Sequence, residues 1–221
     1  MRTVPARLVF LDMDGVLFDF AAGVRGVFQN LPTDETWPRG VDDMAALCGV
    51  TQSQFWKQID KRGTEWWMGI RPYPWANELL KLAEPHFLIL TSPSHSPEAH
   101  AGKVLALQQL LGRSFREYII TPRKHKALLA GPERWLIDDN DDNAREFAEA
   151  GGRSILFPRP WNARHAESAQ PLERVRASLP LPHGCLPDAK ASLCLPHWQA
   201  LRCGHACWMG TEHECPDVGS R

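Results

Sequence analysis

The chain alternates short apolar runs with longer stretches in which apolar and polar residues follow a helical period. The apolar runs lack the polar residue at every second position that marks a half-exposed strand, so they are typical of strands buried on both faces of a parallel sheet. We expect five such strands, at Leu8–Leu11, Phe87–Leu90, Tyr118–Ile120, Trp135–Ile137 and Ser154–Phe157.

The stretches between the later strands carry the boundary signals of helices. Ser96 supplies an N-cap, Pro97 stands in the first turn, and Gly112 closes the same helix. Further helices are expected at 74–84 and 141–150, the second stopped by a pair of glycines. Strands that alternate with helices predict an α/β fold with a doubly wound parallel sheet.

The alternation lapses after the first strand, between residues 20 and 71. This segment has helical periodicity, several aromatic side chains, and a loop at 31–40 that is broken by Pro, Asp and Gly. An insertion directly after the first strand lies over the carboxyl end of the sheet, where open α/β folds bind ligands. We therefore expect a small helical cap at 20–71, and a catalytic core formed by 1–19 together with 72–179.

The first strand ends in two carboxylates, Asp12 and Asp14, followed by Gly15. Neighbouring carboxylates repel, so folding alone gives no reason for the pair, whereas a bound cation does. Asp12 at the strand end is suited to attack phosphorus, and Asp14 to protonate the leaving oxygen and later activate water. Mg²⁺ held by Asp12 and the backbone carbonyl of Asp14 would offset the repulsion. The alternative is a surface Asx turn, which explains neither carboxylate beside a buried strand.

Polar side chains also end two other predicted strands. Thr91 and Ser92 follow the second strand, and their hydroxyl groups either donate to phosphate oxygens or cap the next helix. Asp138 and Asp139 follow the fourth strand, and they either complete a metal site or belong to a solvated acidic loop. The matching pair at the first strand favours the metal site.

A site for phosphoryl transfer also needs a fixed cation that stabilises charge on the transferring group. Lys103 lies near the start of the helix that follows Ser92, and Lys124 lies in the TPRKHK segment after the third strand. We predict that these two lysines hold the phosphate. Arg123 and Lys126 remain competitors for the second position, and each lysine has the alternative of being merely solvated.

Together these motifs resemble those of the haloacid dehalogenase (HAD) superfamily of phosphohydrolases, and in particular its 5′(3′)-deoxyribonucleotidase branch with phage and bacterial relatives. The resemblance covers residues 7–165. DMDGVLFDF from Asp12 is similar to the nucleophile motif of that branch, TSP from Thr91 to its phosphate motif, and LIDD from Leu136 to its magnesium motif. Gly102-Lys103 and Thr121–His125 resemble its lysine-bearing segments, and ILFPRPWN at 155–162 resembles the segment that closes the fold.

The resemblance implies a HAD-like, Rossmann-type core and a Mg²⁺-dependent phosphatase that acts in deoxyribonucleotide catabolism through an aspartyl phosphate. Its substrates would be (deoxy)nucleoside monophosphates. The metal residues that it implies are Asp12, Asp14, Asp138 and Asp139. It also implies that Phe20 and a cap aromatic, Trp66 or Trp67, contact the nucleobase, where stacking is worth about 1–3 kcal/mol per base. Two alternatives stay open: the aromatics only join cap to core, and the substrate is another small phosphomonoester such as a sugar phosphate.

Composition limits the partners. The chain has 221 residues, 43% of them hydrophobic, and a formal net charge of −1, so neither a nucleic-acid polymer nor a membrane surface is suggested as a partner. No apolar run approaches the roughly 20 residues that span a bilayer, and the N-terminus lacks the pattern of a signal peptide. We expect a cytoplasmic protein with a small-molecule nucleotide substrate, and a homodimer is left open.

The segment 180–221 departs from this pattern and forms a proline-, cysteine- and histidine-rich tail. Five of the six cysteines lie there, namely Cys185, Cys194, Cys203, Cys207 and Cys215. Cys203, His205 and Cys207 would supply part of a tetrahedral zinc site, although no paired Cys-x-x-Cys supports it. A loosely packed tail, a structural zinc site and disulfides all stay open. So does a different class of function, a zinc-binding interaction protein that acts through this tail.

Overall fold

The structure is a computed structural model that describes residues 7–180. At its centre is a parallel five-stranded sheet with the strand order β3-β2-β1-β4-β5. The strands are β1 (Leu8–Leu11), β2 (Phe87–Thr91), β3 (Tyr118–Ile120), β4 (Arg134–Asp138) and β5 (Arg153–Leu156). The predicted doubly wound parallel sheet is confirmed, and every predicted strand is found within one residue of its expected bounds.

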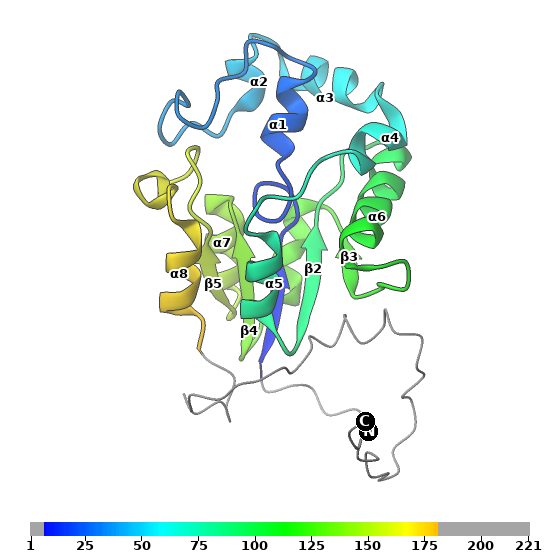
Figure 1. The fold of residues 1–221 in the computed structure, drawn as a ribbon. Coiled ribbons are helices and arrows are strands. Elements are labelled where there is room, and N and C mark those ends of the chain that lie inside the picture. The colour runs from blue at the N-terminus through cyan, green and yellow to red at the C-terminus, as the bar shows by residue number, and fades with distance from the viewer. Residues whose placement is uncertain (1–6, 181–221) are drawn as a thin grey trace, which may run out of the picture.

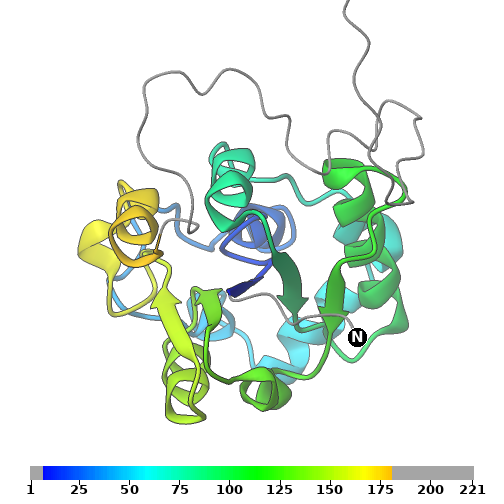
Figure 2. The same cartoon turned by 90° about the horizontal axis from the view of Figure 1, so that it is seen from below.

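Helices cover both faces of the sheet (Figure 1, and along the strands in Figure 2), because the strands are apolar on both sides. Val9 and Leu11 of β1 share one buried cluster with residues of several helices, while Phe10 points to the other face and contacts Phe147, with ring centroids 6.0 Å apart. The core helices are α5 (Ala76–Ala83), α6 (Pro97–Leu111), α7 (Asp141–Glu149) and α8 (Pro171–Ser178), and a 3₁₀ helix, η1 (Arg123–Leu129), precedes β4.

Capping side chains set the helix boundaries that border the carboxyl edge of the sheet. Ser96 accepts a hydrogen bond from the backbone N–H of Glu98 at the start of α6, and Gly112 follows its last residue with φ +101°. Asn140 accepts from the backbone N–H of Asn143 at the start of α7. These caps begin α6 and α7 within a few residues of the ends of β2 and β4.

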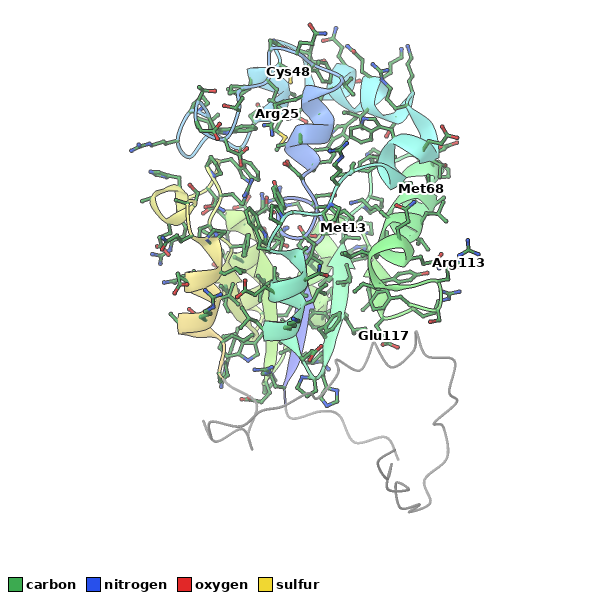
Figure 3. The ribbon with its side chains drawn as sticks, in the orientation of Figure 1. Met13, Arg25, Cys48, Met68, Arg113 and Glu117 are labelled. Atoms are coloured by element: carbon green, nitrogen blue, oxygen red, sulfur yellow. The ribbon has the colours of Figure 1, made fainter. Side chains whose placement is uncertain are left out.

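Four short helices separate β1 from α5. They are α1 (Phe20–Arg25), α2 (Met44–Leu47), α3 (Gln52–Asp60) and α4 (Gly63–Met68), and they lie over the carboxyl ends of the strands (Figure 1). We call residues 20–71 the cap. Figure 3 shows Met13 at the level where the strands end, with Arg25 and Cys48 beyond it in the cap.

The cap contacts the core closely at α6. A Cβ atom on Gly102 would overlap the Cβ atom of Trp67, so only glycine lets α4 approach α6 this far. Beside this contact, the hydroxyl group of Ser94 donates a hydrogen bond to Asp60 at 2.6 Å.

A second contact joins the cap to the segment that follows β5. The backbone N–H of Gly40 donates to the carbonyl of Pro160 at 2.9 Å, and Arg159 pairs with Asp34 at 2.7 Å. The Arg159 guanidinium is buried and lies over the ring of Tyr73, 4.5 Å from its centroid. The cap is therefore fixed to the core on two sides.

Between residues 7 and 180, no helix combines the length and the apolar character needed to cross a bilayer. The zinc site and disulfides considered for the tail involve residues from 181 to 221, which lie outside the described residues.

Candidate active site

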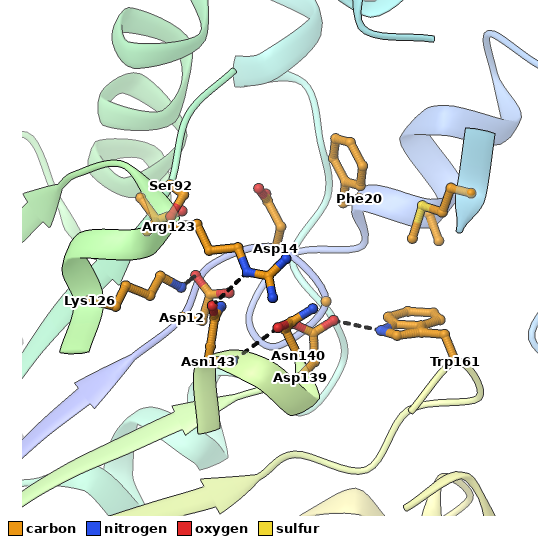
Figure 4. Close-up of a pocket in the computed structure, with 14 residues that line it drawn as sticks. Asp12, Asp14, Phe20, Ser92, Arg123, Lys126, Asp139, Asn140, Asn143 and Trp161 are labelled. Carbon is orange, nitrogen blue, oxygen red and sulfur yellow. Dashed lines mark hydrogen bonds and ion pairs between the residues drawn. The ribbon is translucent and has the colours of Figure 1, made fainter. Parts of the chain in front are cut away.

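The ends of β1, β2 and β4 border a cavity of about 190 Å³ between the sheet and the cap (Figure 4). Because β1 lies between β2 and β4, this is the point where the strand order reverses, which is where open α/β sheets bind ligands. The polar lining consists of Asp12, Asp14, Thr91, Ser92, Arg123, Lys126, Asp139, Asn140 and Asn143, and the apolar lining of Phe20, Ala21, Met44 and Trp161.

Asp12 directly follows β1, and its backbone N–H continues the sheet by donating to the carbonyl of Ile137 at 2.9 Å. Its Oδ1 accepts the backbone N–H of Met13 at 2.8 Å and lies 3.0 Å from Nζ of Lys126. Burial raises the pKa of Asp12 to about 7, Lys126 opposes this rise, and the nearby carboxylate of Asp138 adds to it. A bound cation would therefore favour the ionised form of Asp12.

The buried cation beside Asp12 is Lys126, and Lys124 is exposed to solvent and does not border the cavity. Nζ of Lys126 also lies 2.7 Å from Oδ2 of Asp138, and these carboxylates raise the pKa of Lys126 above its usual range despite burial. In a 3₁₀ helix, residues three apart share a face, so Arg123 and Lys126 both turn toward the cavity and Lys124 turns away. The predicted placement of Lys124 in the site is thus corrected to Lys126.

Lys103 lies on α6 and is fully buried. Its Nζ contacts Oδ2 of the second carboxylate, Asp14. Its Nζ also donates to Oγ1 of Thr91 at 3.1 Å. The other oxygen of Asp14, Oδ1, is buried and has no hydrogen-bond partner among residues 7–180. Figure 4 shows Asp14 extending into the cavity, where this oxygen is able to exchange a proton with a bound molecule.

The two strand-end hydroxyl groups have different surroundings. Thr91 is fully buried and its Oγ1 is engaged by Lys103. Oγ of Ser92 is buried, borders the cavity and has no hydrogen-bond partner in the described part of the chain. An unsatisfied hydroxyl group in a buried site is costly unless a ligand pairs with it. Ser92 is therefore the better donor to a phosphate oxygen, and Thr91 holds Lys103.

Asp138 is fully buried and saturated by protein donors. It accepts four hydrogen bonds, one from Nζ of Lys126 at 2.7 Å, one from the backbone N–H of Asn140 at 2.9 Å, and two from Nδ2 of Asn143 at 3.0 Å each. Its role in this geometry is to hold Lys126 and the start of α7 in place.

Asp139 turns into the cavity and accepts one strong hydrogen bond, from Nε1 of Trp161 to Oδ2 at 2.7 Å. Gly15 has φ +74°, and a Cβ atom there would overlap this carboxylate, so glycine is required both by the backbone and by the approach of Asp139. Burial, followed by the charges of Asp138 and Asp12, raises the pKa of Asp139 well above its usual range.

The carboxylates form a candidate metal site. Asp12, Asp138 and Asp139 each offer an oxygen, and these atoms lie within 4.8 Å of one another. An all-oxygen donor set in which two carboxylates have raised pKa values fits a hard divalent cation such as Mg²⁺. Since Asp138 is saturated, Asp12 and Asp139 are the carboxylates that remain for the ion.

The predicted base-binding aromatics are only partly at the cavity. Phe20 borders it, whereas Trp66 and Trp67 do not. Trp67 is 1% exposed and stacks on Phe20 with centroids 5.7 Å apart, and Trp66 meets Phe20 edge-on at 5.9 Å. Trp67 is buried and Trp66 is half-buried, and both rings contact Phe20, so they support the ring that lines the cavity and do not line it themselves.

Sequence reasoning missed five residues that line the cavity, namely Ala21, Met44, Asn140, Asn143 and Trp161. Asn143 was identifiable, because it follows the N-cap Asn140 by one helical turn and so points back toward the strand end. Met44 and Trp161 reach the cavity only through the folding of the cap and of the segment after β5, and no local pattern marks them.

No protein-family model and no curated protein sequence matches this chain. The similar solved structures are HAD-superfamily hydrolases and relatives. A predicted phosphatase from Clostridium acetobutylicum has a TM-score of 0.47 at 11% identity, covering 77% of this chain and 90% of its own. A predicted phosphoglycolate phosphatase from Haemophilus somnus has 0.45 at 18%, covering 75% and 91%. L-2-haloacid dehalogenase from Xanthobacter autotrophicus has 0.44 at 17%, covering 78% and 88%. TM-scores below 0.5 at these identities do not support a conclusion about activity, so an activity has to be argued from the site of this chain.

Proposed function

We propose that this chain is a HAD-type, magnesium-dependent phosphatase that hydrolyses (deoxy)nucleoside monophosphates to nucleoside and phosphate. One observation carries the proposal: a strand-end carboxylate, a second carboxylate and a buried lysine border a single cavity. These residues are Asp12, Asp14 and Lys126. A second buried lysine, Lys103, contacts the carboxylate of Asp14.

In the first step, a carboxylate oxygen of Asp12 forms a bond to phosphorus while the bond from phosphorus to the sugar oxygen breaks. Asp14 gives a proton to the departing oxygen, which leaves as the nucleoside hydroxyl group. In the second step, Asp14 takes a proton from water as the water oxygen attacks phosphorus, and the bond to Asp12 breaks. The products are inorganic phosphate and the free carboxylate.

The surrounding residues hold the phosphoryl group and the nucleophile. Lys126 fixes the orientation of Asp12, Lys103 contacts Asp14, and Ser92 is free to donate to a phosphoryl oxygen. Such preorganised donors are worth more in a buried cavity than in water. When bound, Mg²⁺ would neutralise charge between carboxylates and phosphate, held by Asp12, Asp139 and the backbone carbonyl of Asp14.

The nucleotide part of the proposal rests on the apolar lining beside the carboxylates. Phe20, Met44 and Trp161 offer contacts to a flat, apolar group. A second cavity of about 390 Å³ shares Met44 and Trp161 with the first and gives room for a molecule larger than the inner cavity. The absence of Trp66 and Trp67 from the cavity lining favours the second candidate, a smaller phosphomonoester such as a sugar phosphate.

Phosphate release from deoxynucleoside monophosphates, ribonucleoside monophosphates and sugar phosphates, each with Mg²⁺ and with chelator, tests the proposal. We expect release that requires the metal and is fastest with nucleotides. Faster release from sugar phosphates would support the phosphatase chemistry and refute nucleotides as the preferred substrates. Release that survives complete chelation would refute the metal, and no release from any substrate would refute the phosphatase.

A further inference from the structure

Among residues 7–180, the side chain that donates a hydrogen bond to the carboxylate of Asp139 is the indole of Trp161. Its Nε1 lies 2.7 Å from Oδ2, and within residues 7–180 no other group donates a hydrogen bond to that carboxylate. The neighbouring Asp138 differs, since four hydrogen bonds fix it from the protein alone. The orientation of Asp139 therefore depends on one indole N–H, which is a donor only.

The packing around this hydrogen bond leaves Asp139 little freedom. A Cβ atom on Gly15 would overlap the carboxylate of Asp139 and would lie 3.1 Å from Cζ2 of Trp161. The carboxylate is thus confined between the loop that carries Asp12 and the indole ring. Figure 4 shows Asp139 between the cavity and the indole nitrogen.

The indole ring is itself held from both the cap and the core. Trp161 is 4% exposed, and its ring packs against the cap residue Trp37 with centroids 5.1 Å apart. On the core side, the Arg159 guanidinium lies 4.6 Å from its ring centroid. The same guanidinium pairs with Asp34 of the cap at 2.7 Å, so the docked cap and the indole ring stabilise each other.

We propose that Trp161 is a positioning residue, whose N–H fixes Oδ2 of Asp139 so that the other carboxylate oxygen faces a divalent cation, with Trp37 holding the indole ring in place. The inference rests on the proposed metal-dependent function and adds a residue to it. Partners that orient a ligating carboxylate typically contribute about 10–100-fold to metal affinity.

The chain offers a matched control for the loss of this N–H. Trp75 also lies beside Arg159, at 5.2 Å, and its Nε1 donates at 3.0 Å to the backbone carbonyl of Val16. Trp75→Phe and Trp161→Phe therefore each remove one indole N–H and keep an aromatic ring against the same guanidinium. Only Trp161→Phe removes a hydrogen bond to a candidate metal ligand.

Binding of Mn²⁺, used as the probe ion and followed by the electron paramagnetic resonance signal of the free ion, separates the two variants without any activity assay. We expect Trp161→Phe to weaken binding by about 10-fold or more, and Trp75→Phe to bind like the unmodified protein. Unchanged affinity in Trp161→Phe would overturn this inference and leave the proposed function standing. An unmodified protein that binds no Mn²⁺ would overturn both.

Should Trp161→Phe fail to fold, the unmodified protein with ¹⁵N-labelled tryptophan tests the same contact. Addition of Mg²⁺ should shift one indole N–H resonance clearly more than the others, because one indole donates to a ligand of the ion. Indole resonances that all stay in place at saturating Mg²⁺ would overturn the inference.

Discussion

The two walls of the cavity are built in different ways. At the sheet edge, charged groups fix one another, and Lys126 is held between Asp12 and Asp138 at 3.0 and 2.7 Å. On the cap side, Phe20 and Met44 offer only apolar contacts. The first wall is able to hold reacting atoms in one geometry, whereas the second is able to select a ligand by shape and stacking. In the proposed function, chemistry and selectivity would thus belong to different segments of the chain.

The largest effect is expected from Asp12→Asn in the charged wall, which is the wall at the sheet edge. Turnover should fall by about 10⁴-fold or more, since the amide is a poor nucleophile toward phosphorus. The fold should remain, because the ionised carboxylate is itself unfavourable in this buried place. Phosphate release and thermal unfolding measure both properties, with Glu149→Gln on the exposed side of α7 as the control. Near-normal turnover in Asp12→Asn would rule out the nucleophile.

A smaller effect in the same wall is expected from Lys126→Met, with Lys124→Met as its matched control. Removing Lys126 leaves two buried carboxylates without their cation, so stability should fall by about 3–5 kcal/mol, and turnover by about 10²–10³-fold. Lys124 is exposed, and its loss should change stability by less than about 0.5 kcal/mol. Urea unfolding and phosphate release check the pair, and equal effects of the two substitutions would contradict the placement of Lys126.

In the apolar wall, Phe20→Leu keeps a hydrophobic side chain and removes the aromatic face. Stacking of about 1–3 kcal/mol corresponds to a rise in KM for nucleotides of about 5- to 160-fold, with kcat little changed. A base-free substrate such as ribose 5-phosphate provides the comparison and should be affected much less. The same loss with both substrates would assign Phe20 to packing alone.

The smallest effect concerns the pH dependence of stability in the metal-free protein. The pKa of Asp12 is about 7 in the folded protein against 3.8 ordinarily, so protonated Asp12 stabilises the fold below pH 4 and this contribution is lost as the pH rises toward 7. Asp139 acts in the same direction.

Thermal unfolding at pH 5 and pH 8, with and without Mg²⁺, tests this dependence. We expect Mg²⁺ to raise Tm more at pH 8, where the carboxylates must be ionised in the folded state with or without the ion. Asp12→Asn should weaken the pH dependence of the metal-free protein. An equal shift of Tm by Mg²⁺ at both values would contradict the link between these pKa values and the metal.

Most of the sheet was predictable from the sequence, since strands buried on both faces give continuous apolar runs such as Leu8–Leu11. Helix α6 was predictable because Ser96 and Gly112 mark its ends. Helix α8 was not predicted, because Pro171 at its first position is its only start signal and no side chain caps it, while its stability comes from burying Leu172 and Val175 against the rest of the core.

The candidate site was predictable where it depends on topology alone. Parallel strands bring their carboxyl ends to one edge, which places Asp12 and Asp139 together without further information. The choice between Lys124 and Lys126 depends on whether a short segment forms a loop or a 3₁₀ helix, which local sequence does not determine. The position of Trp161 was not predictable for a similar reason, because it follows from tertiary packing against Trp37.

Gly102 and Lys103 are consecutive residues of α6, and this adjacency limits the separation between the two walls. Gly102 receives Trp67 of the cap, and Nζ of Lys103 lies 5.2 Å from the Trp67 ring centroid while it contacts Asp14. The same turn of α6 therefore both contacts the cap and supplies the positive charge beside Asp14. A chimera that received a cap from another protein would have to keep glycine and a closely packed ring at this seam, or accept an altered proton donor along with its new selectivity.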